Sequence, residues 1–347
     1  MKIANHEIDG GSRAFIIAEV AQAHEGSLGL AHSFIDAIAD SGADAVKFQT
    51  HIADAESTKD EPFRILMSGQ DATRWDYWKR MEFTKDQWVG LAEHARQRGL
   101  VFLSSPFSVA AVNLLAELGM PAWKVGSGEV FNEQLMSAMA SKGGPILISS
   151  GMSSYDEIAR SFNIAKGYGA EVILFQCTSL YPAPLEEVGI NVLHELRQRF
   201  KCPVGLSDHS GTVYPSLAVL AQGADLIEVH VVFDKKMYGP DAKASVTFNE
   251  LAEIVKANHA FQKMRENPVD KNALATEFEA TRKLFTKSVA LAIPLDAGVV
   301  LMPEHLTLKK PGTGISADQL SALLGRRLAN TVSADRLLRW DDFEPNS

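Results

Sequence analysis

The amino-acid sequence predicts an α/β protein, a (β/α)8 (TIM) barrel followed by a small, separate C-terminal domain. Three observations lead to this fold class: eight apolar runs of strand length, helical patterns between them, and a change of texture after residue 286. Continuous apolar runs that alternate with helices are typical of a parallel sheet buried on both faces. Eight such units in about 250 residues fit a closed barrel better than an open sheet. No G-x-G-x-x-G follows a predicted strand, so the dinucleotide-binding alternative has no support.

The apolar periodicity bounds the elements, and a glycine just past several helices is typical of a C-cap. The predicted strands are Ala14–Glu19, Ala45–Gln49, Val101–Ser105, Trp123–Gly126, Ile146–Ser149, Val172–Cys177, Val204–Asp208 and Leu226–His230. The predicted helices are Leu28–Ser41, Lys85–Arg98, Ser108–Leu118, Asn132–Lys142, Tyr155–Tyr168, Val188–Phe200, Val213–Gln222 and Asn249–Arg265. Near the N-terminus, the runs 3–8 and 14–18 flank Asp9-Gly10-Gly11, which predicts a hairpin.

The domain boundaries follow from composition. Residues 1–268 form the predicted barrel, 269–286 a polar linker with a helical stretch near Thr276–Arg282, and 287–347 the small domain. The small domain shows short strands, Val289–Ile293 and Leu306–Lys309, between turns. Residues 51–84 form a long insertion after the second strand, with Trp75, Tyr77, Trp78 and Met81. Such loops act as lids or substrate walls, and the alternative is a hydrophobic patch that packs on the barrel rim.

Composition and charge exclude several classes of function. The chain has 347 residues, 46% hydrophobic and 22% charged, with a formal charge of −9. The negative charge argues against nucleic-acid or membrane-surface binding, which needs a basic patch. No apolar run approaches the roughly 18 residues of a membrane span, and residues 1–9 do not read as a signal peptide. Cys177 and Cys202 do not form a metal or disulfide motif. We therefore expect a cytoplasmic, globular protein.

Polar side chains gather at the C-terminal ends of the predicted strands, where the active site of a barrel lies. They are Glu19, Lys47, Gln49, Ser104, Ser105, Lys124, Ser127, Ser149, Ser150, Gln176, Thr178, Ser207, Asp208, His209, Glu228 and His230. Buried ammonium groups are costly unless paired, so two lysines and a ring of serines predict a bound anion that carries phosphate and carboxylate. Gly126-Ser-Gly128 and Ser149-Ser-Gly151 would let backbone N–H groups approach its phosphate.

His209 and His230 end two neighbouring predicted strands. Two neutral imidazoles form half of a divalent-metal site, and the alternative is a pair of core histidines bonded to the backbone. Lysines in a barrel also suggest a Schiff-base aldolase, with Lys124 or Lys47 as the nucleophile. That chemistry leaves the histidines and one lysine unused. A metal-assisted addition of an anionic nucleophile to a carbonyl uses them all.

Several motifs resemble one family in the order in which they occur. They are Ala23-His-Glu-Gly-Ser-Leu28, Val46-Lys-Phe-Gln-Thr50, Ser104-Ser-Pro-Phe-Ser108, Lys124-Val-Gly-Ser-Gly-Glu129, Ser149-Ser-Gly-Met152, Gly205-Leu-Ser-Asp-His209, His230 and Gly239-Pro-Asp241. Over essentially its whole length the chain is similar to the sialic acid synthase family, the phosphoenolpyruvate-dependent N-acetylneuraminate synthases. The stretch with Lys310-Pro-Gly-Thr-Gly314 looks like that family's antifreeze-like (SAF, β-clip) domain.

The resemblance implies a reaction and a set of site residues. Phosphoenolpyruvate condenses with open-chain N-acetylmannosamine, water is added, and phosphate leaves by C–O cleavage with the help of Mn²⁺ or Mg²⁺. The implied metal ligands are His209 and His230. The residues implied for phosphoenolpyruvate are Lys47, Ser105, Lys124, Ser127, Ser149, Ser179 and Ser207. Those implied for the sugar are Glu25, Gln49, Tyr181, Asp241 and Lys310, and those implied for catalysis are Glu129, Glu25 and Lys124. The family also implies a domain-swapped homodimer.

Two departures loosen the sugar assignment. Ser179 stands where the bacterial sialic acid synthase pattern has Asn, and Lys310 stands where the antifreeze-like domain often has Arg, whose planar fork Lys lacks. A synthase of legionaminic or pseudaminic acid is therefore an alternative. Glu25 could instead be a charge at a helix N-terminus and Asp241 a turn residue. Two further alternatives are a Schiff-base pyruvate lyase and a non-catalytic glycan- or ice-binding module, although a dead barrel has no need of the histidines, lysines and Glu129.

Overall fold

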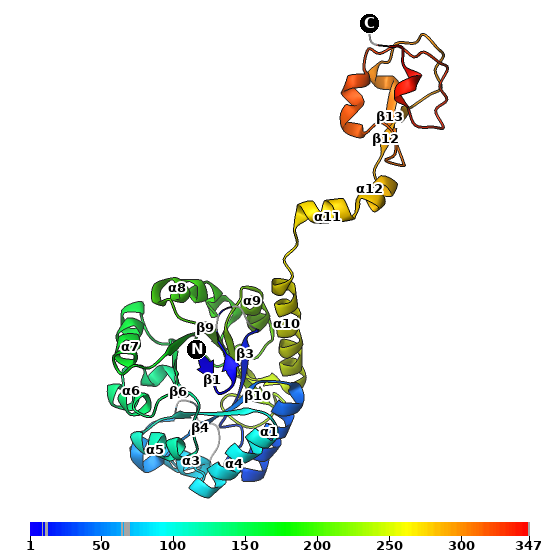
Figure 1. The fold of residues 1–347 in the computed structure, drawn as a ribbon. Helices are drawn as coiled ribbons and strands as arrows, with labels where there is room; N and C mark the ends of the chain where they lie inside the picture. Colours follow the sequence, from blue (N-terminus) through cyan, green and yellow to red (C-terminus); the bar gives the residue numbers. More distant parts are fainter. Residues whose placement is uncertain (9, 11–12, 64, 66–69, 346–347) are drawn as a thin grey trace. The chain divides into compact units, whose positions relative to one another are not determined.

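The computed structural model describes residues 1–8, 10, 13–63, 65 and 70–345 (Figure 1). The chain divides into two compact units, Met1–Glu266 and Asn267–Ser347, and each unit has its own hydrophobic core. Unit 1 is the barrel with its helices, and unit 2 holds the small C-terminal fold. None of the helices in the described part of the chain is long and apolar enough to cross a membrane.

Eight parallel strands form the barrel. They are β3 (Phe15–Ala21), β4 (Ala45–Thr50), β5 (Val101–Pro106), β6 (Trp123–Val125), β7 (Ile146–Ser149), β8 (Val172–Cys177), β9 (Val204–Asp208) and β10 (Leu226–Val232). Their order is β5-β4-β3-β10-β9-β8-β7-β6, and contact between β5 and β6 brings the two ends together. A short strand, β11 (Val246–Thr247), pairs in parallel with the end of β10. The predicted fold class is confirmed, and every predicted barrel strand is present within two residues of its expected ends.

The helices surround the strands (Figure 1). They are α1 (Leu28–Ser41), α4 (Lys85–Gln97), α5 (Val109–Glu117), α6 (Glu133–Ala140), α7 (Tyr155–Gly167), α8 (Ile190–Phe200), α9 (Tyr214–Ala221) and α10 (Phe248–Glu266). Ser27 and Ser154 cap the N-termini of α1 and α7 through their side chains, as expected for this residue type. The helices bury one face against the strands, and this layer contains most of the hydrophobic core.

The N-terminal hairpin is not the one that the sequence predicts. The runs 3–8 and 14–18 do not pair, because 14–18 enters β3, which lies parallel to β4 and β10. The hairpin is instead β1 (Lys2–Ile3) with β2 (His6–Glu7), and the predicted turn residues Asp9 and Gly11 lie outside the described residues. A continuous apolar run is typical of a strand buried on both faces, which β3 is. Ile3 and Ile8 join the core at the N-terminal end of the barrel interior.

The insertion and the C-terminal unit are built from short elements. The insertion contains α2 (Ala53–Glu56) and α3 (Arg74–Met81), and Thr73 and Asp76 form a capping box at the start of α3. The single helical stretch predicted near Thr276–Arg282 is two helices, α11 (Lys271–Glu277) and α12 (Glu279–Phe285), which meet at Phe278. The last unit pairs β12 (Ser288–Leu291) with β13 (Leu306–Lys309) in antiparallel register.

Candidate active site

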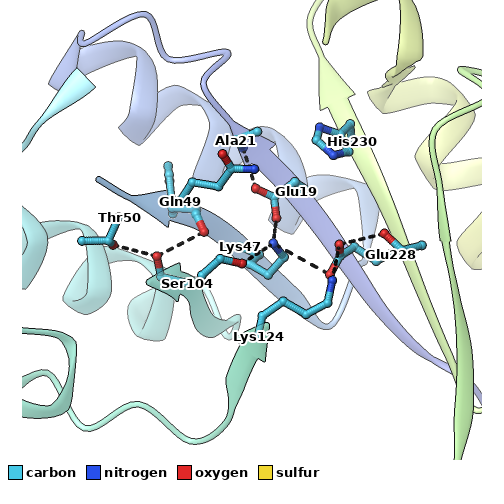
Figure 2. Close-up of polar contacts among 12 residues, drawn as sticks. Glu19, Ala21, Lys47, Gln49, Thr50, Ser104, Lys124, Glu228 and His230 are labelled. Carbon is cyan, nitrogen blue, oxygen red and sulfur yellow. Dashed lines mark hydrogen bonds and ion pairs between the residues drawn. The ribbon is translucent and has the colours of Figure 1, made fainter. Parts of the chain in front are cut away.

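Four charged side chains meet inside the barrel at the C-terminal ends of its strands (Figure 2). We call them the charge cluster: Lys47 of β4, Lys124 of β6, Glu19 of β3 and Glu228 of β10. Each is at most 4% exposed. Lys124 Nζ lies 2.9 Å from Glu228 Oε1, and Lys47 Nζ forms an ion pair with Glu19 and lies 3.8 Å from Glu228 Oε2. The two ammonium groups therefore have two carboxylate partners within the protein.

The strand register brings these side chains together. Glu19 is level with Lys47 on one side and with His230 on the other. A bulge after Glu19 lets the backbone N–H of Ala21 donate to Glu19 Oε1 at 2.9 Å. The strand-end pattern contains both glutamates but does not identify them as site residues. One feature of the sequence could have identified Glu228 as a site residue. It lies two residues before His230, so the two side chains face the same side of the strand.

The charge cluster shifts the proton affinities of its members. Burial alone would raise the pKa of Glu228, but Lys124 and Lys47 outweigh burial and hold this pKa at about 2. At Glu19 burial dominates and raises the pKa to about 7, although Lys47 opposes it. Burial would lower the pKa of Lys47, but Glu19 and Glu228 hold it above its ordinary value. Lys47 is therefore an ammonium group at neutral pH, the form that binds an anion.

Hydroxyl groups adjoin the charge cluster. Lys47 Nζ donates to Ser105 Oγ at 3.2 Å, and Ser207 Oγ donates to Glu228 Oε1 at 3.0 Å. Ser149 is buried at the end of β7. A phosphate that approached the lysines would thus find serine donors beside them.

The remaining predicted hydroxyls gather around Gly151. Its N–H donates to Ser127 Oγ at 3.2 Å. A Cβ at this position would lie 2.8 Å from both Ser127 Oγ and Cys177 Sγ, and closer still to Ser179 Oγ. Only glycine leaves room for these three side chains. Apart from Ser149, the residues predicted for phosphoenolpyruvate therefore form two groups, one on the charge cluster and one at Gly151.

His209 and His230 lie next to each other at the ends of β9 and β10, with ring centroids 5.2 Å apart. His209 Nδ1 is 2.9 Å from the carbonyl oxygen of Thr178, so Nδ1 is the donor and Nε2 keeps its lone pair, 3.2 Å from the Tyr181 hydroxyl. Burial, reinforced by His230, lowers the pKa of His209 to about 3. A neutral imidazole whose tautomer is fixed by a carbonyl is suited to bind a metal ion.

The donor set fits a divalent ion that keeps open positions. Within the described ranges, no group of three or more His, Cys, Asp or Glu side chains is placed to hold a metal ion. His209 and His230 would supply two ligands, and oxygen atoms of substrate and water would supply the others. Open positions are a property of catalytic rather than structural metal sites.

A cavity of about 380 Å³ lies beside His230. Five of the predicted site residues line it: Gln49, Glu129, Tyr181, His230 and Asp241. Gln49 Oε1 accepts a hydrogen bond from Gln22 Nε2 at 3.0 Å and lies 3.3 Å from His51 Nε2. Because two neighbours engage its oxygen, Gln49 is held in one orientation at the cavity wall.

The remaining residues predicted for the sugar are Glu25 in the barrel unit and Lys310 in the C-terminal unit. Glu25 follows β3, and Arg80 donates to its Oε2 at 3.0 Å. Burial raises the pKa of Glu25, and Arg80 opposes that rise. Lys310 belongs to the C-terminal unit, where its ammonium group lies 5.2 Å from the centroid of the Phe285 ring.

The insertion supplies one wall of the cavity. His51 is stacked between Trp78 and Phe107, with centroid distances of 3.9 and 4.4 Å, and its Nδ1 lies 2.5 Å from Glu56 Oε1. Tyr77 and Trp78 line the cavity, whereas Met81 is buried on the core. The substrate-wall and rim-packing interpretations therefore each describe part of the insertion. We call the cavity the acidic pocket, because five carboxylates line it: Glu56, Glu61, Asp71, Glu129 and Asp241.

Comparison with known families decides what kind of protein carries this site. Residues 34–270 match the model of the NeuB family. The chain belongs to the NeuB family. Residues 286–344 match the model of the SAF domain, so the C-terminal unit contains a SAF domain. The resemblance to sialic acid synthases that the motifs indicate is confirmed.

Relatives of this NeuB-family chain carry names for different products. It is 33% identical to the N,N′-diacetyllegionaminic acid synthase of Campylobacter jejuni, over 94% of this chain and 99% of that protein. It is also 33% identical to the N-acetylneuraminate-9-phosphate synthase of Homo sapiens, over 94% and 92%. A crystal structure of N-acetylneuraminic acid synthetase from Leptospira borgpetersenii, in complex with citrate, matches with a TM-score of 0.72 and 30% identity, over 81% of this chain and 95% of that chain. The chain is thus an enzyme of the NeuB type.

Proposed function

We propose that this NeuB-family enzyme condenses phosphoenolpyruvate with open-chain N-acetylmannosamine and releases phosphate, as an N-acetylneuraminate synthase. The charge cluster is the observation that carries the proposal, because it holds two buried ammonium groups at the same end of the barrel as the adjacent rings of His209 and His230. The second candidate acceptor is the hexosamine that leads to legionaminic or pseudaminic acid. The names of two relatives, at 33% and 29% identity, are the observation behind this second candidate.

The charge cluster favours anion binding over Schiff-base chemistry. A lysine that forms a Schiff base must lose its proton, and such lysines have a lowered pKa. Lys47 has a raised pKa because of its glutamate partners, and Lys124 is ion-paired with Glu228. Both lysines are therefore suited to hold the phosphate and carboxylate of phosphoenolpyruvate.

A divalent ion, Mn²⁺ or Mg²⁺, completes the proposed site. His209 and His230 would hold it, with His209 kept neutral and oriented by the carbonyl oxygen of Thr178. When bound, the ion supplies Lewis-acid polarisation of the aldehyde group of the sugar. Side chains of the protein would stabilise the other charges that develop during the reaction.

The proposed reaction forms one carbon–carbon bond and breaks one carbon–oxygen bond. C3 of phosphoenolpyruvate attacks C1 of the aldehyde, which leaves a cationic centre at C2. Glu129, which lines the acidic pocket, would stabilise that charge. Water adds at C2, and phosphate departs with the bridging oxygen while Lys47 and Lys124 offset its charge. The proton that water loses balances the proton that the aldehyde oxygen gains.

A domain-swapped homodimer also belongs to this proposal, and it rests on the resemblance alone. In such a dimer the SAF domain of one chain would cap the barrel of the other and bring Lys310 to the sugar. We also propose a cytoplasmic location, which suits a chain whose Cys177 and Cys202 are free thiols.

Phosphate release tests the proposed function. The purified chain is incubated with Mn²⁺, phosphoenolpyruvate labelled with ¹⁸O at the bridging oxygen, and a panel of hexosamines that includes N-acetylmannosamine. We expect hexosamine-dependent phosphate that carries the label and that EDTA abolishes. No phosphate release with any hexosamine would refute the proposal. Trapping of pyruvate on Lys124 by borohydride, unaffected by EDTA, would establish the lyase instead.

A further inference from the structure

We infer that the acidic pocket selects a hexosamine without a phosphate group, and that the insertion carboxylates Glu61 and Asp71 set this selectivity. The inference rests on the proposed function and names the acceptor class that the same site takes. Family membership leaves the question open, since the relatives include a synthase whose name specifies a 9-phosphate product and others whose names do not.

The lining of the acidic pocket is strongly negative. Among the residues that the structure describes, five carboxylates and one arginine, Arg74, line it, a formal charge of −4 when histidines are not counted. The charge cluster differs, because its two lysines balance its two glutamates. A phosphoryl group carries about −1.5 to −2 at pH 7 and would add to the negative charge of the pocket.

The arginines at this wall are already engaged by carboxylates. Arg74 Nε lies 3.1 Å from Glu61 Oε1, and the same guanidinium donates to the carbonyl oxygen of Pro62 at 3.2 Å. Arg80 donates to Asp71 at 2.9 and 3.0 Å and to Glu25 at 3.0 Å. The charge balance differs from that of the charge cluster, because these two guanidinium groups serve three carboxylates, Glu61, Asp71 and Glu25. A phosphoryl group at this wall would therefore add to an existing excess of negative charge.

The same pocket offers a neutral hexosamine both hydrogen-bond acceptors and apolar surface. Its hydroxyl and acetamido N–H groups are donors, and carboxylate oxygens are strong acceptors for them. Tyr77 and Trp78 offer apolar surface for the sugar carbons and the acetyl methyl group. The wall that repels phosphate therefore suits an uncharged polar acceptor.

The test compares one acceptor with and without its phosphate. The full-length chain with Mn²⁺ and phosphoenolpyruvate is given N-acetylmannosamine or its 6-phosphate, and the products are counted by mass spectrometry. We expect kcat/KM to favour the neutral sugar by at least about 100-fold. Equal or better use of the 6-phosphate would overturn the inference while it upholds the proposed condensation of phosphoenolpyruvate with a hexosamine. Failure of both sugars and of every other hexosamine would overturn the proposed function and the inference together.

Variants that remove one negative charge test whether Asp71 and Glu61 set the preference for the neutral sugar. Asp71→Asn removes one partner of Arg80, and Glu61→Gln removes the partner of Arg74, so each should shrink the preference for the neutral sugar at least about tenfold. Glu93→Gln changes an exposed carboxylate on α4 and should leave the preference as it is in the wild type. Thermal melts identify any variant that fails to fold. An unchanged preference in whichever of Asp71→Asn and Glu61→Gln folds would contradict the assignment.

Discussion

The charge cluster and the acidic pocket share strand β4 but follow opposite designs. Lys47 belongs to the cluster, and Gln49, two residues on, lines the pocket. The cluster balances two ammonium groups with two carboxylates on strands of the barrel. The pocket gathers five carboxylates, and three of them lie on the insertion after β4. This difference in charge explains how one barrel can bind an anionic substrate and a neutral one at neighbouring positions. Paired lysines can share their charge with an arriving anion, and a negative wall admits a neutral sugar.

Removal of a lysine from the charge cluster should have the largest effect. Lys47→Met leaves Glu19 buried without its partner, and breaking a buried pair lowers the free energy of unfolding by about 3–5 kcal/mol. Turnover should fall about 100-fold or more, because a preorganised donor is lost. Urea unfolding and phosphate release measure the two effects.

Lys59→Met is the matched control for this prediction. Lys59 lies on the insertion, 5.3 Å from the centroid of Trp75, and should matter by about 1 kcal/mol or less. Equal stability losses in the two variants would show that the cluster is not the balanced unit described here.

Loss of a histidine should come next and should separate metal binding from folding. His209→Ala removes one of the two imidazoles at the boundary between the charge cluster and the acidic pocket. Metal affinity should fall about 100-fold or more, since even a lost outer-shell partner costs 10–100-fold. His194→Ala, on α8, is the control and should bind metal as the wild type does. Mn²⁺ titration followed by electron paramagnetic resonance measures affinity, and a His209→Ala variant that unfolds would return this ring to a structural role.

Packing beneath the charge cluster should give a smaller effect. A Cβ on Gly205 would lie 2.7 Å from both the Phe175 ring and the carbonyl oxygen of Leu226, and the ammonium group of Lys124 rests over the same ring. Gly205→Ala should therefore cost about 1–3 kcal/mol by overpacking. Gly90→Ala, on α4 with nothing within 4 Å, should instead stabilise the chain by about 0.5–1 kcal/mol. Thermal and urea unfolding would contradict this if the two variants moved in the same direction.

The smallest predicted effect is on how steeply the free energy of unfolding changes with pH. Burial, with His230 nearby, lowers the pKa of His209 from 6.5 to about 3, so the native state keeps this ring neutral where the unfolded chain takes up a proton. This contribution to stability is complete above pH 6.5 and is lost as the pH falls toward 3. In His209→Gln the free energy of unfolding should fall less steeply, by about 1.4 kcal/mol per pH unit. Urea unfolding between pH 4 and 6 measures the two slopes, and parallel slopes would contradict the shifted pKa.

The two regions also differ in how far the sequence predicts them. Lys47, Lys124, His209 and His230 are visible as polar interruptions of apolar strands, because period-two alternation and the barrel topology fix where they point. The pairing of Lys47 with Glu19 was not visible, since it depends on the register between β3 and β4 and on a bulge. Register is a property of two strands, and neither sequence contains it alone.

The acidic pocket was harder to predict. Asp71 and Glu61 lie in a stretch without strong periodicity, and their positions follow from contacts such as Arg80 with Asp71 and Trp78 with His51. Such contacts join residues 9 to 27 positions apart on irregular backbone. Nothing in the local pattern distinguishes these carboxylates from the acidic residues of an ordinary solvated loop.

Separate Michaelis constants for the two substrates test the division between the regions most directly. Lys124→Met should raise KM for phosphoenolpyruvate at least about tenfold and leave KM for the hexosamine within about twofold, because Lys124 belongs to the charge cluster. Gln49→Met should do the reverse, because Gln49 lines the acidic pocket. That crossed pattern is the predicted result. A rise of both constants in both variants would contradict the account of two regions with separate substrates.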